Sequence, residues 1–344
     1  MRATVTRPFA PRATDGGPDV GLGQPDATSA PIRAALGLAL GFASHVLAGL
    51  SPFIVAAVIA RTALLPGIAL VYGLGTASLA TLLILPGARQ HVREWTSVLT
   101  SPAWRVAFVS SLAGFLVAGV AFYIGLTRSS RVAEYVFLTR LDWIVQAPVA
   151  ILVLHEPWTG RGLAGAAVAL AGGLLIVWTG AVGTSGLTAA VVYVAASSVA
   201  YLGASRIARA GGLPGAVALT VWRHIVNTIG FVVLALAMGS ADPVRVGAGT
   251  IALGMLSACV LLGLFQCRFA ALTRVPLWVL SAQAPVQAVV ALVASRLTEG
   301  APSAATLVAV LMIVSGEVIV ASAQRSMPPT RDTDAPPGIV GVRR

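Results

Sequence analysis

The chain has 344 residues, of which 57% are apolar and only 10% are charged, and its mean hydropathy is +0.88. Soluble domains are roughly a quarter charged, so this composition excludes an ordinary water-soluble protein and indicates a membrane protein. The net charge of +11 does not indicate a nucleic-acid binder, because the 23 basic residues, all of them Arg, are spread between long apolar stretches.

Residues 1–32 are rich in Pro, Gly, Asp, Thr and Arg and contain no apolar stretch typical of a signal peptide. We expect them, and residues 325–344, to be disordered cytoplasmic tails. Between the tails, apolar segments long enough to cross a ~30 Å hydrocarbon core follow one another. The ten expected transmembrane helices are approximately 34–59, 67–86, 104–126, 131–153, 161–180, 187–205, 213–238, 249–272, 276–296 and 303–323.

The arginines outside these helices predict the orientation, because cytoplasmic loops carry an excess of positive charge. With the N-terminus inside, the inner set is Arg33, Arg89, Arg93, Arg105, Arg161, Arg206, Arg209, Arg274 and Arg325, and the outer set is Arg61, Arg128, Arg131, Arg245 and Arg296. We therefore expect a multi-pass protein of the cell (inner) membrane with both termini in the cytoplasm.

Short sequence matches recur in the same order in the two halves of the chain. They are Leu65-Pro66-Gly67 with Leu213-Pro214-Gly215, Leu126-Thr127-Arg128 with Leu272-Thr273-Arg274, and the seventeen-residue intervals Glu156 to Gly173 and Glu299 to Gly316. Residues 33–181 and 186–324 are thus predicted to be two five-helix repeats. Because five is odd, the second repeat enters the membrane from the opposite side, which is typical of carriers. The expected fold is an all-α integral membrane protein with ten transmembrane helices in a 5+5 inverted repeat.

The same segments carry a family resemblance. Tyr123-Ile124-Gly125-Leu126-Thr127, then Leu154-His155-Glu156-Pro157-Trp158-Thr159, then Leu163-Ala164-Gly165 and Ala171-Gly172-Gly173 resemble the EamA family of the drug/metabolite transporter superfamily. The resemblance implies ten helices, cytoplasmic termini, and export or exchange of small metabolites such as amino acids, driven by proton or substrate gradients.

Polar residues form a stripe on the otherwise apolar helix expected at 131–153. At 100° per residue, Arg131, Tyr135, Thr139, Asp142 and Gln146 lie within roughly an 80° arc. Such a stripe is expected to face a cavity or partner helices. Asp142 either exchanges a proton or meets a substrate amine, or it forms a fixed ion pair with an Arg. Arg140 lies on the opposite side of an ideal helix and is expected to pair elsewhere or to reach the interface.

The helix expected at 213–238 has a similar stripe of Thr220, Arg223, His224 and Asn227. The Arg223 guanidinium can donate two parallel hydrogen bonds to a carboxylate or phosphate. It either binds a substrate carboxylate or pairs with Asp142 or Glu134.

Other polar residues are also expected at membrane depth. His45 is either a proton relay or a buried neutral His. The remaining candidates are Tyr193, Ser197, Tyr201, Trp278, Gln283 and Gln287. Glu317 is expected to be paired or to reach the interface. Small residues at Gly37 and Gly41, and at Gly165, Ala169 and Gly173, form either a dimer face or, more in keeping with ordinary packing, contacts within one bundle.

These features favour a secondary-active carrier that exports a small metabolite, such as an amino acid or related carboxylate, by alternating access. Multidrug-type efflux of lipophilic cations, with Asp142 and Trp278 or Trp143 as the binding pair, is the alternative. No motif of an enzyme, a metal site or a channel filter is apparent, and Cys259 and Cys267 lie in one apolar stretch. We expect no enzyme activity and no cofactor. The expected partners are a small-molecule substrate, protons and the bilayer, with no nucleic acid, for a monomer or homodimer.

Overall fold

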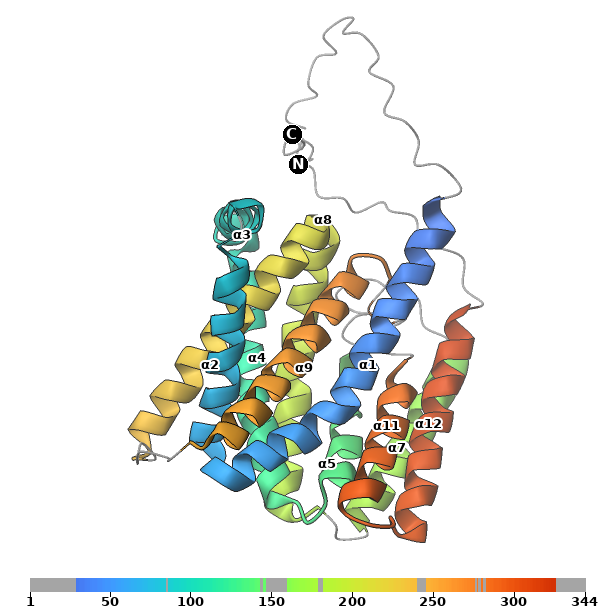
Figure 1. Ribbon diagram of the computed structural model, residues 1–344. Helices are drawn as coiled ribbons and strands as arrows, with labels where there is room; N and C mark the ends of the chain where they lie inside the picture. The colour runs from blue at the N-terminus through green and yellow to red at the C-terminus, as the bar shows by residue number, and fades with distance from the viewer. Residues whose placement is uncertain are drawn as a thin grey trace, which may run out of the picture.

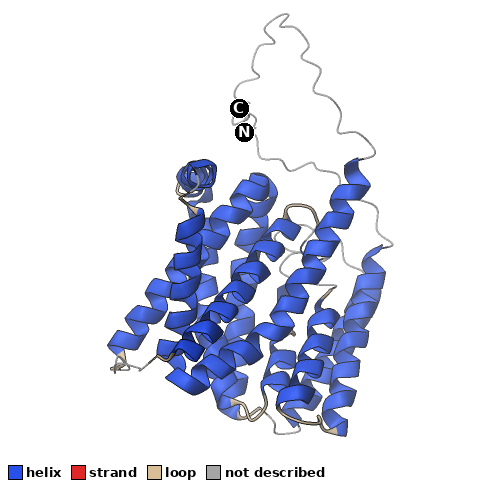
Figure 2. Cartoon of the chain, in the orientation of Figure 1, coloured by secondary structure: helices blue, strands red, loops and turns tan. Residues whose placement is uncertain are grey.

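A computed structural model describes residues 29–84, 86–142, 145–146, 160–178, 182–239, 246–275, 277, 280 and 283–325. Within these ranges every regular element is a helix, and one isolated antiparallel bridge joins Ser129 to Val182 (Figure 2). The helices are α1 (Ser29–Thr62), α2 (Leu64–Leu82), α3 (Pro86–Leu99), α4 (Pro102–Arg128), α5 (Val132–Thr139), α7 (Gly160–Trp178), α8 (Thr184–Ala237), α9 (Ala248–Leu272), α11 (Ala284–Thr298) and α12 (Ala304–Arg325).

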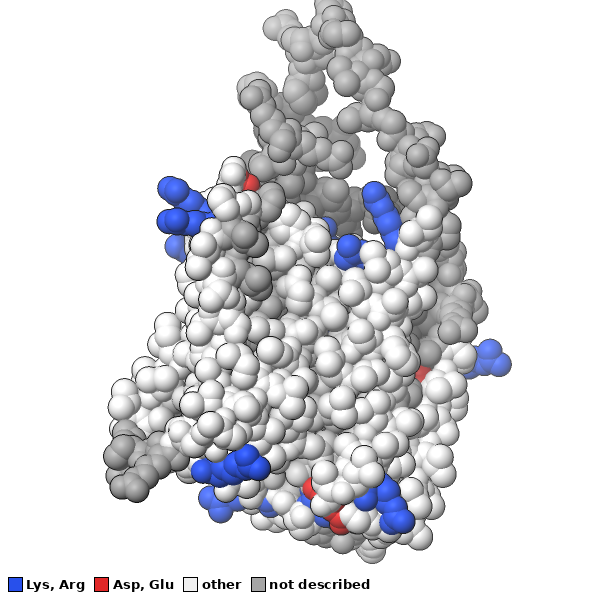
Figure 3. All heavy atoms as spheres, in the orientation of Figure 1, with Lys and Arg blue, Asp and Glu red and all other residues white. Residues whose placement is uncertain are grey.

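Most of these helices run side by side in one bundle (Figure 1). Among the described residues, six helices are long and apolar enough to cross a membrane, namely α1, α2, α4, α7, α8 and α9. Large apolar side chains such as Val109, Val117 and Val199 are exposed on the outside of the bundle. Basic side chains gather mostly at its two ends on the face shown in Figure 3. These are the features of a membrane-embedded helical protein.

Two features at the end of the bundle where α1 begins differ from expectation. The segment after α2, expected as a loop, forms the helix α3, which lies across the other helices (Figure 1). α1 begins at Ser29, inside the segment expected to be a disordered tail. The rest of that tail, and residues 326–344, lie outside the described residues.

The sequence predicted two separate helices around residue 212, and the structure joins them through a kink. Gly212 has φ +55° and ψ −149°, a conformation that only glycine adopts readily, so the chain reverses there within α8. On α3, Trp95 lies directly against Gly211, and a Cβ there would approach the indole to 2.7 Å. The Trp222 Nε1–H donates to Thr96 Oγ1 over 2.8 Å. α3 forms because its apolar residues meet this kink.

The small residues singled out in the sequence contact other segments of the same chain. Gly37 and Gly41 on α1 lie against the segment 274–283. Gly165 and Ala169 on α7 meet Gly316 on α12. Of the two readings of these residues, packing within one bundle is therefore the one that the structure shows for these positions.

This close packing leads to a prediction on stability. A Cβ at Gly316 would collide with the backbone of Gly165 and Ala169, which cannot move aside as a flexible side chain can. We expect Gly316→Ala to lower the free energy of unfolding by about 1–3 kcal/mol. Unfolding in mixed detergent micelles measures it. Gly73→Ala is the matched control, because a Cβ at this helical glycine meets nothing within 4 Å. An equal loss in both variants would contradict the packing argument.

Candidate substrate site

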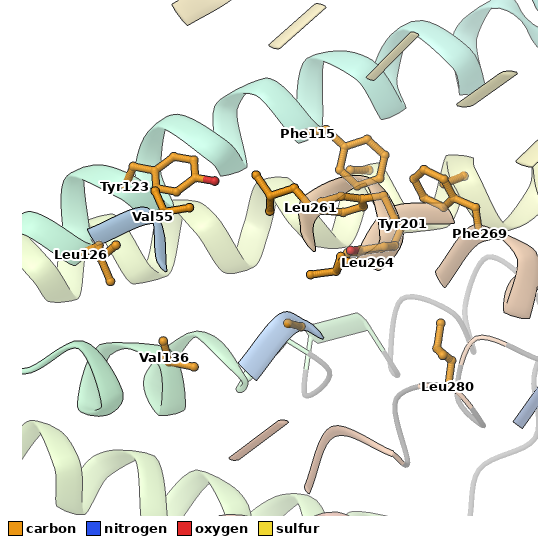
Figure 4. Packing of buried hydrophobic residues seen from close by; sticks show 14 of the residues in the cluster. Val55, Phe115, Tyr123, Leu126, Val136, Tyr201, Leu261, Leu264, Phe269 and Leu280 are labelled. Carbon is orange, nitrogen blue, oxygen red and sulfur yellow. The ribbon is translucent and has the colours of Figure 1, made fainter. Parts of the chain in front are cut away.

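A small polar cavity of about 30 Å³ lies inside the bundle. Its polar lining comes from distant parts of the chain: His45 on α1, Arg140, Asp142 and Gln146 at and after the end of α5, Tyr201 on α8 and Arg268 on α9. Leu277, Leu280 and Ala284 complete it. Figure 4 shows Tyr201 beside Phe115 and Phe269, with Leu280 across from them.

Arg140 lies in this cavity together with Asp142, contrary to the expectation that the two face opposite ways. The expectation assumed a continuous helix, whereas α5 ends at Thr139 and Arg140 is its C-cap. The buried guanidinium donates from Nη1 to Gln287 Oε1 over 3.0 Å and from Nη2 to the Tyr193 hydroxyl over 2.9 Å. Arg140 thus ties α5 to α8 and α11.

Arg268 is a site residue that the sequence analysis did not single out. Its Nη1 donates to the Tyr201 hydroxyl over 2.8 Å, and the side chain is buried. The signal was present, since a lone guanidinium in the apolar stretch 248–272 is itself a functional indication.

His45 links Arg268 to the backbone. Its Nε2 is 2.9 Å from the Leu280 carbonyl oxygen, which can only accept, so Nε2 carries the hydrogen. Its Nδ1 faces Arg268 Nη2 at 3.5 Å and accepts from it. Both contacts belong to a neutral imidazole. Of the two readings of His45, this geometry favours the buried neutral His over the proton relay.

The predicted stripe on α5 divides into two parts. Gln146 Nε2 donates to Asp142 Oδ2 over 3.2 Å, and both residues line the cavity. The hydroxyls of Tyr135 and Thr139 instead donate to the backbone carbonyls of Ala121 and Val136. Tyr135 and Thr139 therefore contribute to helix packing.

The other polar candidates have varied positions. Gln287 Nε2 donates to the Ala48 carbonyl and Gln283 Nε2 to the Leu38 carbonyl, which ties the segment around α11 to α1. Ser197 donates within its own helix, to Val194. Glu317 is buried on α12 and does not belong to the cavity lining. Trp278 and Trp143 lie outside the described residues.

Arg223 does not belong to the cavity lining, and its described partners are aromatic. Its Cζ lies 3.2 Å from the ring centre of Phe265 and 5.3 Å from that of Phe115, and Nη2 donates to the Tyr72 hydroxyl over 3.1 Å. The expected pairing with Glu134 is absent, because Glu134 Oε1 accepts from Thr306 over 2.8 Å and lies 3.9 Å from Arg131 Nη1.

Phe115 contacts both Arg223 and a residue of the cavity lining. Its ring centre is 5.2 Å from that of Tyr201, which lines the cavity, and 5.3 Å from the Arg223 guanidinium. The sequence analysis considered Arg223 as a partner of Asp142, whereas Asp142 lines the cavity and Arg223 does not.

Comparisons with known proteins identify the fold alone. No family model and no curated protein matches the sequence. One similar solved crystal structure, described only as that of a protein, superposes with a TM-score of 0.61 and 21% identity, covering 85% of this chain and 98% of that chain. Nearly all of that protein therefore shares this arrangement of helices.

Proposed function

We propose that the chain is a secondary-active carrier that exports small carboxylate-bearing metabolites through the cavity of Arg140, Asp142 and Arg268. The charge of the lining is the observation that carries this proposal. Two guanidinium groups face one carboxylate and a neutral His45. A lining with an excess positive charge in a low-dielectric interior attracts an anionic group.

The remaining lining groups fit the rest of a zwitterionic substrate. Asp142, held by Gln146, is placed to meet an ammonium group or to exchange a proton, while Arg140 and Arg268 take the carboxylate. The hydroxyls of Tyr193 and Tyr201 hold the two guanidinium groups in place. Substrate would compete with these internal contacts, and that competition couples binding to helix movement.

The arrangement of helices supports a 5+5 inverted repeat of the EamA type, with both termini in the cytoplasm. In such a repeat, equivalent helices meet across an axis in the membrane plane. Thr76 on α2 meets Thr228 on α8 with hydroxyls 2.8 Å apart, and Gly75 lies against His224. On α7 and α12, Gly172 lies against residues 309–313 and Gly316 against residues 165–169. The cavity lining comes from both halves of the chain, as alternating access in such a repeat would require.

Efflux of lipophilic cations has less support. The aromatic rings of Tyr72, Phe115 and Phe265 surround the chain's own Arg223, and the cavity lining carries excess positive charge. A cation would have to overcome that charge.

Counterflow in proteoliposomes tests the proposal. Vesicles preloaded with a mixture of unlabelled amino acids and small carboxylates should take up labelled members of that class, and not labelled lipophilic cations. Arg268→Gln should reduce this uptake at least tenfold, because it removes one charge-assisted contact to the carboxylate. Arg61→Gln, an exposed arginine at the end of α1, is the control. Unchanged flux in Arg268→Gln, or uptake of lipophilic cations by the parent protein, would contradict the proposal.

A further inference from the structure

Five buried polar atoms on one face of the second half of α8 have no hydrogen-bond partner among the described residues. They are Arg223 Nε and Nη1, His224 Nε2, and both amide atoms of Asn227. The three side chains are 4%, 1% and 1% exposed. Polar groups in a membrane interior are costly to leave unpaired, so a set that shares one face points to a ligand.

The geometry of Arg223 leaves its donors available. Phe265 stacks on the face of the guanidinium, at 3.2 Å between Cζ and the ring centre. Guanidinium N–H groups point outward in the plane, so stacking on the face does not cover them. Tyr72 takes one N–H of Nη2. No carboxylate contacts Arg223 in the described part of the chain, so a bound anion would stabilise its buried positive charge.

His224 offers the opposite hydrogen-bonding character. Its Nδ1 is 2.8 Å from the Thr220 carbonyl oxygen, which can only accept, so Nδ1 carries the hydrogen. The unpartnered Nε2 of the neutral ring is therefore an acceptor. Asn227, one turn after Arg223, adds one donor group and one acceptor. The set fits a ligand with an anionic group beside a hydrogen-bond donor.

The surroundings limit the ligand to a small one. Gly75 on α2 comes close to His224, where an added Cβ would lie 3.2 Å from Cδ2. Gly119 on α4 faces Asn227 and Phe231, at 3.7 and 3.5 Å from an added Cβ. Because both positions are glycine, α2 and α4 come close to this face of α8, and the space left for a ligand is small.

We infer that Arg223, His224 and Asn227, none of which lines the cavity, form a second buried site for a small carboxylate that carries an adjacent O–H or N–H group. The carboxylate binds the Arg223 donors and the adjacent donor group binds His224 Nε2. This inference goes beyond the proposed function, since binding here does not require that the chain transports.

Thermal unfolding in detergent tests the site, with glycolate, acetate and chloride as sodium salts at equal concentration. We expect stabilisation in the order glycolate, acetate, chloride. Glycolate should bind about 2- to 10-fold more tightly than acetate, the gain of one hydrogen bond. His224→Phe should remove the advantage of glycolate over acetate and keep acetate binding. Arg223→Gln should weaken both at least tenfold.

Arg268→Gln separates this site from the cavity. The glycolate effect should persist in that variant even where counterflow is lost, so failure of the proposed function and failure of this inference are distinguishable. Equal unfolding temperatures in the three salts, or chloride as the best stabiliser, would overturn the inference. So would loss of the order in Arg268→Gln but not in Arg223→Gln. If Arg223→Gln does not fold, the comparison of glycolate with acetate in His224→Phe decides.

Discussion

Replacing Arg140 by Gln is expected to reduce transport by about 100-fold or more. Arg140 shares the cavity with Asp142 and donates to Gln287 and Tyr193, so it connects α5 to α11 and α8. Removing one partner of a buried charged set costs about 3 kcal/mol or more, because the remaining carboxylate loses a nearby cation. Such a loss corresponds to a factor of ~100 in rate. Initial rates of counterflow, normalised to the amount of folded protein in the vesicles, measure it.

A matched variant separates this effect from the general loss of an arginine. Arg128 is exposed at the end of α4, so Arg128→Gln should leave transport within about twofold. Size-exclusion profiles show whether each variant remains folded. If Arg140→Gln is folded and transports at the parent rate, Arg140 has no part in the substrate site.

Replacing Glu299 by Ala is expected to loosen the end of the bundle where α5 begins. There Glu299 Oε1 accepts from the backbone N–H of Val132 over 2.8 Å, and Arg131 Nη2 donates to the carbonyls of Gly300 and Ala301. Thr306 donates to Glu134 over 2.8 Å. These contacts join the start of α5 to the connection between α11 and α12 (Figure 1). A carrier that opens at this end must break them.

Hydrogen exchange measures the loosening. Without the Glu299 carboxylate the Val132 amide loses a charge-assisted acceptor, so amides at the start of α5 should exchange roughly tenfold faster or more. Glu94→Ala is the control, since Glu94 is exposed on α3 and accepts a surface hydrogen bond from Gln90. Unchanged protection of Val132 in Glu299→Ala would show that this contact does not hold the two segments together.

Local pattern was enough to predict four of the helices closely. Hydropathy placed α4, α7, α9 and α12 within a few residues of their observed bounds, because a membrane-spanning segment must be apolar along its whole length. Small residues within the apolar segments indicated close helix contacts inside one bundle, and Gly165 and Ala169 on α7 do pack against Gly316 on α12. Polar residues within apolar segments indicated Asp142, Gln146 and His45 as members of a site.

What the tertiary structure alone decided is which of these residues meet. α5 ends at Thr139, so the ideal-helix angle no longer applied and Arg140 came to lie with Asp142. α9 brought Arg268 to His45 from 223 residues away. Phe115, on another helix, contacts Arg223, which does not line the cavity. The sequence by itself determined a helical membrane protein with charges at membrane depth, because each helix is governed by its own composition. Partners across helices depend on packing between distant segments, which no local pattern specifies.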